Sequence, residues 1–218
     1  MSSESNINGG PNSDPANTAV PALSVPAFVQ ELVRGKRIFL GVSGGIAAYK
    51  AATITSKLAQ AGAIVTVAMT RSAARFITPL TFQALSGRHV YTSPWQHVES
   101  QDPQHISLAT SMDLAIVAPC TMDCMARLAA GRTNDVITLI LSAVDRKRCP
   151  VLLAPSMNSV MWQQPATQRN LRTLQDDGFQ FIGPDDGWQA CRHVGTGRMS
   201  EPESILAVIA STLAPGRV

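Results

Sequence analysis

One thiol stands in a setting that suits chemistry. Cys191 lies in the segment ACRHVGTGRM, directly before Arg192 and His193 and ahead of glycines that let a backbone bend around a bound molecule. A second candidate is Asn158 in APSMNSVMW, where a side-chain amide can donate to a carboxylate while Met161 supplies an apolar wall. The amide could therefore bind a carboxylate, although this motif also suits the start of a hydrophobic helix packed against the core. The role of the thiol depends on the fold around it.

A glycine-rich loop follows the first apolar run of the chain. In SGGIAAYK, residues Ser43, Gly44 and Gly45 let the backbone approach an anion, and the N–H groups of the following helix start point toward it. The spacing is neither the dinucleotide fingerprint GxGxxG nor a P-loop, which needs GK followed by Ser or Thr. The loop suits the phosphate of a mononucleotide such as FMN, and a plain tight turn explains it equally well.

Three further polar residues have simpler explanations when each is taken alone. Thr70 and Ser72, in TRSAARF, could give hydroxyls to the same phosphate, but Thr and Ser also commonly cap helices. His105, in DPQHISLAT, could act as a general base near neutral pH, yet a histidine at a helix start is often a surface or capping residue. These residues become informative only together with the motifs above.

The elements that must position these residues form a regular alternation. Continuous apolar runs predict strands of a parallel sheet covered by helices on both faces, and ligands bind beyond the carboxyl ends of such strands. We predict a single α/β domain with a Rossmann-like or flavodoxin-like sheet over 36–214, after a disordered tail (1–22) and a helix (23–35) that Ser24 caps and Gly35 ends. The predicted strands are 37–42, 63–69, 113–119, 150–155 and 179–183, and the predicted helices are 46–62, 72–86, 121–143, 165–177 and 202–213.

The composition of the 218-residue chain argues against several classes of protein. Its net charge of +3 and the lack of a basic stripe interleaved with aromatic residues disfavour nucleic acid as a partner. No apolar run approaches the length that crosses a membrane, and the polar N-terminus does not resemble a signal peptide. The cysteines lack CxxC spacing and ligand partners, so we expect free thiols, no metal site and a cytoplasmic location. Cys120 and Cys124, four apart on a predicted helix, and Cys149, at a strand start, are interpreted as core or interface residues.

Taken together, the motifs resemble the family of homo-oligomeric flavin-containing cysteine decarboxylases. The similarity runs from about Lys36 to Pro202 in one collinear series of blocks: SGGIAAYK, HISLA, ARLAAGRTND, PSMNSVMW and ACRHVGTGRMSEP. PSMNSVMW fits the family pattern PxMNxxMW at every fixed position. Within the family, the blocks are most similar to the phosphopantothenoylcysteine decarboxylases of coenzyme A biosynthesis, and more distantly to the peptidyl-cysteine decarboxylases of lantibiotic maturation.

The resemblance implies a homotrimer, or several trimers assembled together, with FMN bound between adjacent subunits. His105 would be the catalytic base and Cys191 a late-acting proton donor, while Asn158, Met161 and Arg192 would bind the substrate. The residues that would hold FMN are Ser43, Gly44, Gly45, Ile46, Thr70, Ser72, Phe76, Thr121, Asn134 and Asp135.

The implied reaction suits a cysteine carboxylate. Direct loss of CO₂ would leave a carbanion with nowhere to delocalise, so the carbon that bears sulfur is first oxidised to a thioaldehyde, with FMN as the acceptor and His105 as the base. The product is an ene-thiol. The coenzyme A enzymes reduce it with help from the cysteine that corresponds to Cys191, whereas the lantibiotic-type enzymes, which lack this cysteine, release it.

Two substrates stay open on these grounds. The presence of Cys191 favours 4'-phosphopantothenoylcysteine as the substrate and 4'-phosphopantetheine as the product. The alternative is a ribosomally made peptide that ends in cysteine, because the coenzyme A enzymes typically read ACGD where this chain has ACRH, and because their usual fused ligase domain does not follow before Val218. A regulatory flavoprotein without catalysis is a minor alternative, which the complete set of catalytic positions disfavours.

Overall fold

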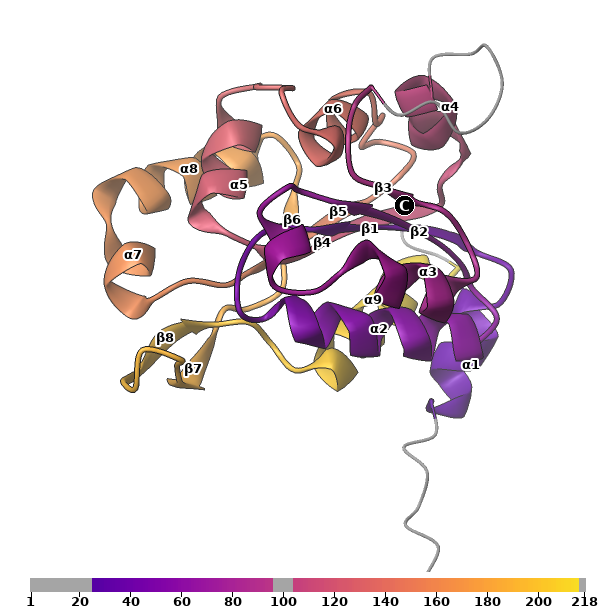
Figure 1. The fold of residues 1–218 in the computed structure, drawn as a ribbon, viewed down its shortest axis with the longest axis horizontal. Coiled ribbons are helices and arrows are strands. Elements are labelled where there is room, and N and C mark those ends of the chain that lie inside the picture. The colour runs from indigo at the N-terminus through magenta and orange to yellow at the C-terminus, as the bar shows by residue number, and fades with distance from the viewer. Residues whose placement is uncertain (1–24, 96–103, 216–218) are drawn as a thin grey trace, which may run out of the picture.

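The computed structural model describes residues 25–95 and 104–215 as one α/β domain, so the predicted disordered tail (1–22) and Ser24 lie outside the described residues. Six parallel strands form the central sheet in the order β3-β2-β1-β4-β5-β6, which is the strand order of the Rossmann fold (Figure 1). This confirms the predicted parallel sheet. The strands are β1 (Arg37–Val42), β2 (Ile64–Met69), β3 (Val90–Tyr91), β4 (Leu114–Cys120), β5 (Val151–Pro155) and β6 (Gln180–Phe181).

Helices cover both faces of this sheet, as Figure 1 shows. One face carries α1 (Ala27–Val33), α2 (Ala48–Gln60), α3 (Pro79–Ser86) and α9 (Pro202–Leu213). The other face carries α4 (Gln104–Ser111), α5 (Met122–Ala129), α6 (Val136–Ser142) and α8 (Pro165–Asp176). Within the described part of the chain, no helix is long and apolar enough to cross a membrane.

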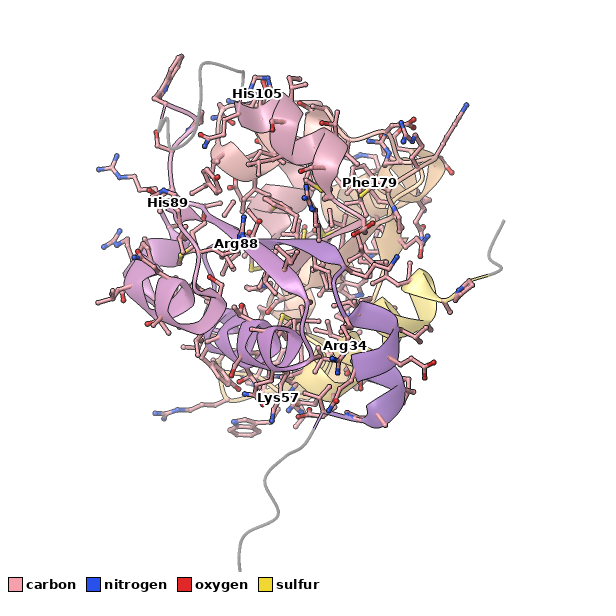
Figure 2. The ribbon with its side chains drawn as sticks, turned by 90° about the vertical axis from the view of Figure 1, so that its right-hand side faces the viewer. Arg34, Lys57, Arg88, His89, His105 and Phe179 are labelled. Atoms are coloured by element: carbon pink, nitrogen blue, oxygen red, sulfur yellow. The ribbon has the colours of Figure 1, made fainter. Side chains whose placement is uncertain are left out.

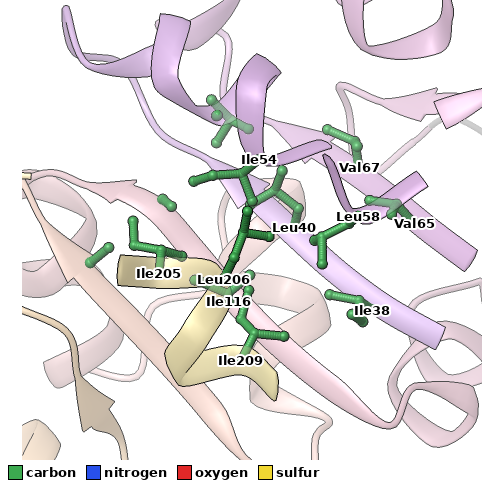
Figure 3. Packing of buried hydrophobic residues seen from close by; sticks show 14 of the residues in the cluster. Ile38, Leu40, Ile54, Leu58, Val65, Val67, Ile116, Ile205, Leu206 and Ile209 are labelled. Atoms are coloured by element: carbon green, nitrogen blue, oxygen red, sulfur yellow. The ribbon is translucent and has the colours of Figure 1, made fainter. Parts of the chain in front are cut away.

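Each strand contributes to two hydrophobic cores, one on each face of the sheet. Along β1, Ile38 and Leu40 pack in the core beneath α2 and α9, while Phe39 between them packs in the core on the opposite face. This alternation follows from the two-residue period of a strand, and burial on both faces explains why the strands appear as unbroken apolar runs. Figure 3 shows the first core, in which Ile54 of α2 and Ile205 of α9 meet the strands.

Two predicted helices are each divided into shorter pieces. The predicted helix 72–86 consists of a 3₁₀ turn, Ala73–Arg75, and α3, which begins at Pro79. The preceding Thr78 is extended, with φ −78° and ψ 149°, because a proline ring disfavours helical backbone in the residue before it. The predicted helix 121–143 consists of α5 and α6, and Gly131 between them has a left-handed φ of +62°. The prediction of two continuous helices was therefore wrong.

The N-terminal helix is shorter than predicted. Pro26 precedes its first residue, Ala27, in place of the predicted Ser24 cap. Gly35 adopts a φ of +72° one residue after Arg34, the C-cap, so the predicted end at this glycine is confirmed.

The sequence analysis missed a small hairpin near the C-terminal end of the chain. β7 (Asp185–Trp188) and β8 (Val194–Arg198) pair antiparallel and form a separate two-stranded sheet. A short helix, α7 (Ser159–Gln163), contacts β8. The hairpin strands read DDGW and VGTGR, which lack the apolar alternation that would predict strands. The ACRH segment therefore lies at the tip of a β-hairpin that projects beside α7 (Figure 1).

Candidate functional site

A large cavity opens at the carboxyl ends of β1, β2, β4 and β5, where the order of the sheet predicts a binding site. Its volume is about 1110 Å³, and the β7–β8 hairpin forms one wall. Most of the predicted site residues meet here although they come from separate motifs. The predicted residues that line the cavity are Ser43, Gly44, Gly45, Ile46, Thr70, Ser72, Thr121, Asn134, Asp135, Asn158, Met161 and Cys191.

The glycine-rich loop after β1 is held tightly against its neighbours. The buried Ser43 hydroxyl donates to the carbonyl oxygen of Pro119 at 2.7 Å and accepts from the Thr121 N–H at 3.0 Å, which joins the loops after β1 and β4. A Cβ on Gly44 would come within 2.9 Å of the carbonyl carbon of Ser72. Only glycine therefore lets the two loops approach this closely, and the residues that lead from this loop into α2, Gly45 to Ala47, line the cavity.

The Thr70 hydroxyl has the capping role that its residue type allows. It accepts from the Ala73 N–H at 3.1 Å at the start of the 3₁₀ turn. Ser72 makes no such capping bond, so its hydroxyl differs from that of Thr70 in this respect. Both residues line the cavity beside Arg71.

Arg127 contacts three other polar residues of the cavity lining. Arg127 of α5 pairs with Asp123 at 2.9 Å and with Asp135 at 3.4 Å, and it donates to the Asn134 Oδ1 at 3.1 Å. The hydrogen bond with Asp123 raises the pKa of the Arg127 guanidinium. Asp135 in turn caps α6 by accepting from the Ile137 and Thr138 N–H groups. The hydrogen bond to Asn134 and the ion pair with Asp135 therefore hold these two side chains at the cavity wall.

The amide and the thiol singled out from the sequence come together at the cavity. The Asn158 Nδ2 donates to the Cys191 Sγ at 3.1 Å across 33 residues of sequence. The Asn158 Oδ1 accepts from the Val160 N–H at 2.8 Å and so caps α7, which leaves the amide nitrogen directed at the thiol. Cys191 is exposed at the hairpin tip, and Met161 lies half-exposed nearby in the cavity lining.

Lys50, Gln189 and Arg198 also line the cavity and were missed by the sequence analysis. Lys50, 5% exposed, donates to the Met199 carbonyl oxygen at 2.9 Å and pairs with Glu201 at 3.1 Å. Glu201 also pairs with Arg198, so these charges join α2 to the base of the hairpin. The sequence did contain a signal for Lys50, because this lysine lies among the apolar residues of the face that α2 buries. A buried lysine requires a hydrogen-bond or ion-pair partner.

Three predicted site residues do not line this cavity. Phe76 is 54% exposed just after the 3₁₀ turn, and Arg192 lies exposed at the hairpin tip with a φ of +65°. His105 is half-buried on α4, which packs against α6. In Figure 1, α4 lies near the opposite end of the sheet from α7 and the hairpin, and Figure 2 shows His105 at the outer end of its helix. A single chain therefore does not bring His105 to Asn158 and Cys191.

The other three cysteines are buried, as predicted. Cys120 ends β4 rather than lying on a helix with Cys124, because the chain turns into α5 only after Thr121. The hydrogen bond with Cys124, together with burial, raises the pKa of Cys120 well above its usual range. Burial, with a contribution from Asp113, raises the pKa of Cys149 to about 11. All four thiols are free, and the described residues contain no group of three His, Cys, Asp or Glu side chains that could hold a metal ion.

Comparisons with known proteins point to one family. The family described as Flavoprotein matches residues 28–214. The coenzyme A biosynthesis bifunctional protein CoaBC of Bacillus subtilis (strain 168) is 47% identical over 175 residues, which make up 80% of this chain and 42% of that protein. The chain thus spans less than half the length of this curated relative.

Solved structures agree in fold. A cysteine-to-serine mutant of PPC decarboxylase, complexed with pantothenoylaminoethenethiol, superposes with a TM-score of 0.75 at 28% identity, over 82% of this chain and 98% of the other. The FMN binding protein AtHal3 gives a TM-score of 0.72 at 30% identity, over 82% and 97% of the two chains. With a family match over nearly the whole described structure, the chain belongs to the Flavoprotein family.

Proposed function

We propose that this protein is an FMN-dependent cysteine decarboxylase that converts 4'-phosphopantothenoylcysteine to 4'-phosphopantetheine. The observation that carries the proposal is the 3.1 Å contact between the Asn158 amide nitrogen and the Cys191 sulfur. Both residues line the same cavity as the glycine-rich loop Ser43 to Gly45. The identity to CoaBC and the fold shared with PPC decarboxylase support the same substrate.

The residues present fit FMN. The loop at Gly44 has no room for a side chain, so a phosphate could come close to the main chain between β1 and α2, which lines the cavity. The cavity lining has four cationic side chains, Lys50, Arg71, Arg127 and Arg198, and two carboxylates, Asp123 and Asp135. This excess of positive charge suits a phosphorylated cofactor and substrate, although Lys50, Arg127 and Arg198 are already in ion pairs. When bound, FMN supplies a two-electron acceptor for the carbon that bears sulfur.

Asn158 would bind and orient the substrate carboxylate. A side-chain amide has two N–H donors, so Asn158 can keep one on the Cys191 sulfur and give the other to the carboxylate. Because the Asn158 carbonyl is held by the helix cap of α7, the amide cannot turn over without losing that bond. The apolar Met161 beside it would pack against the uncharged part of the substrate.

Cys191 would act after CO₂ has left. Its exposed thiol can give a proton to the ene-thiol carbon as electrons return to the product. This role separates a pathway that ends in a saturated thiol from one that ends in an ene-thiol.

The four free thiols fit a reducing compartment, and we place the reaction in the cytoplasm.

The catalytic base would come from a second copy of the chain. His105 is distant from the cavity within one chain, so we propose a homotrimer, or a multiple of it, in which His105 of a neighbouring copy completes each site. Exposed apolar side chains near the glycine-rich loop support an interface there, because a second copy would remove them from water. They are Ile46 (59% exposed), Tyr49 (61%), Phe76 (54%) and Leu80 (70%).

A peptide with a C-terminal cysteine is the second candidate substrate. Arg192 and His193 stand exposed at the hairpin tip, where the coenzyme A enzymes typically carry glycine and an acid, and a cationic tip could bind an extended acidic peptide. The exposed cations of the tip are the one feature that supports the peptide, whereas the cationic residues of the cavity support the phosphorylated substrate.

Anaerobic incubation of the FMN-loaded protein separates these candidates. Phosphopantothenoylcysteine and a peptide ending in cysteine are each supplied, and CO₂ and the product mass are measured. We expect CO₂ and phosphopantetheine from the first substrate. CO₂ from the peptide alone would overturn the assignment of phosphopantothenoylcysteine as the substrate. No CO₂ from either compound would overturn the decarboxylase proposal in favour of a flavoprotein that only binds.

A further inference from the structure

Gln189 is buried in a hairpin tip that is otherwise exposed. The residue is 8% exposed, whereas the four residues after it are all exposed. Its main chain closes the tip: its N–H donates to the His193 carbonyl oxygen and its own carbonyl accepts from the Arg192 N–H, both at 2.9 Å. The tip that carries Cys191 is therefore built around this glutamine.

The Gln189 side chain joins the hairpin to α7. Its Nε2 donates to the Gly195 carbonyl oxygen of β8 at 3.2 Å, and its Oε1 accepts from the Ser159 N–H at 3.2 Å. The same Oε1 lies 3.5 Å from the Cys191 Sγ, within reach of the thiol proton. One amide thus contacts the thiol, the opposite strand, and the residue next to Asn158.

Gly195 and Gly197 leave the space that this amide occupies. A Cβ on Gly197 would overlap the Met157 carbonyl oxygen and would lie 3.0 Å from the Gln189 Nε2. A Cβ on Gly195 would meet the Ser159 Cβ at 3.0 Å. Two glycines of the VGTGR strand therefore let the hairpin lie close enough to α7 for the amide to reach both.

We propose that Gln189 is a positioning residue that holds the Cys191 thiol against Asn158 for the proton transfer that follows CO₂ loss; this inference rests on the proposed function. In the resting state, the Gln189 side-chain carbonyl accepts a hydrogen bond from the Cys191 thiol, and the Asn158 amide donates one to the sulfur. The two amides therefore hold the sulfur in place. An uncharged acceptor is required, because a carboxylate at this position would make loss of the thiol proton less favourable and would have no donor for Gly195.

Alkylation by iodoacetamide tests the contact without substrate. Cys120, Cys124 and Cys149 are buried, so the alkylation rate of the folded protein reports on Cys191. In Gln189→Glu, a unit charge near 3.5 Å from the sulfur is expected to slow alkylation roughly five- to tenfold at pH 8. The matched control is Gln168→Glu, which alters a similar bond from Nε2 to the Trp162 carbonyl oxygen at 2.7 Å and should alkylate like the unaltered protein.

Product analysis of the FMN-loaded protein tests the role. In Gln189→Glu and Gln189→Met, reduction of the ene-thiol should fall more than CO₂ release does, so that ene-thiol accumulates. Gln189→Met, which adds no charge, should not slow alkylation. If alkylation is unaffected by Gln189→Glu, or if CO₂ release falls as much as reduction does in both variants, the positioning role is wrong. If the unaltered protein releases no CO₂, the proposed function fails, while the alkylation result still decides whether Gln189 contacts the thiol.

Discussion

The close approach of Gly44 to Ser72 gives a sharp test of whether the loop after β1 binds a phosphate, as proposed. A Cβ at Gly44 would lie 2.9 Å from the Ser72 carbonyl carbon, where ordinary contacts are near 3.5 Å or longer. The neighbouring Gly45 is a matched control, because its Cβ would meet only the Thr121 Cγ2 at an ordinary 3.5 Å and it does not have a positive φ. The two alanine variants therefore differ in steric overlap and hardly in chemistry.

The cost of Gly44→Ala can be estimated from this overlap. The added Cβ would overlap the Ser72 Cβ and also lies close to the Ser72 carbonyl carbon and the Ala73 nitrogen, which are fixed parts of the chain. The loops after β1 and β2 must therefore move apart, which typically costs about 1 to 3 kcal/mol. For a domain of this size, that corresponds to a melting temperature lower by about 2 to 12 °C. Gly45→Ala should leave the melting temperature unchanged or raise it slightly, since alanine lowers the entropy of the unfolded chain.

Two measurements check this prediction. Thermal unfolding of the FMN-free variants measures stability without the ligand, and fluorescence titration measures FMN affinity. Displacement of the loop should weaken FMN binding by Gly44→Ala about tenfold or more, because one charge-assisted hydrogen bond is worth about 1.5 to 3 kcal/mol. If Gly44→Ala melts and binds FMN as the unaltered protein does, the loop is not the phosphate site and the steric argument fails.

Three further changes have directions set by the structure. Arg192→Gly should raise the free energy of unfolding, measured in urea, by about 0.5 to 1 kcal/mol, because Arg192 has a left-handed φ of +65° that favours glycine; a loss of stability would contradict this. Asp135→Ala should lower it by about 1 to 2 kcal/mol through loss of two capping bonds on α6, and an unchanged urea midpoint would refute the cap. Because burial raises the pKa of Cys149 to about 11, folding favours the protonated thiol. Stability should therefore be nearly constant below about pH 8.5 and fall by about 2 to 3 kcal/mol toward pH 11, because each unit of pKa difference is worth about 1.4 kcal/mol. Cys149→Ala should reduce that fall, and an equal fall in both proteins would contradict the assignment.

The sheet could be predicted because its strands are buried on both faces. Runs such as Ile38 to Val42 are continuously apolar, and that signal is local in the sequence. The position of the cavity followed from the sheet, since the loops after parallel strands meet at one edge. The residue pairs Ser43 with Thr121 and Asn158 with Cys191 were each anticipated as members of one site, and the structure brings them into contact.

The hairpin could not be predicted in the same way. Its strands are stabilised by glycines that allow close packing and by the side chain of Gln189, whose three contacts come from residues that are 2 to 30 positions away. No local pattern of apolar residues records such contacts. The breaks at Pro79 and Gly131 were visible in the sequence, but the apolar residues on either side favoured continuous helices.

The separation of His105 from the thiol has a consequence for mixed assemblies. On the proposed function, His105→Asn and Asn158→Ala would each be inactive, and each would keep the residue that the other has lost. If subunits exchange freely in an equal mixture, about one quarter of the interfaces would pair an intact imidazole with an intact amide, and turnover would reappear from two dead proteins. Because this recovery requires subunit exchange, its dependence on time and protein concentration would test the proposal that each site is formed by two neighbouring copies.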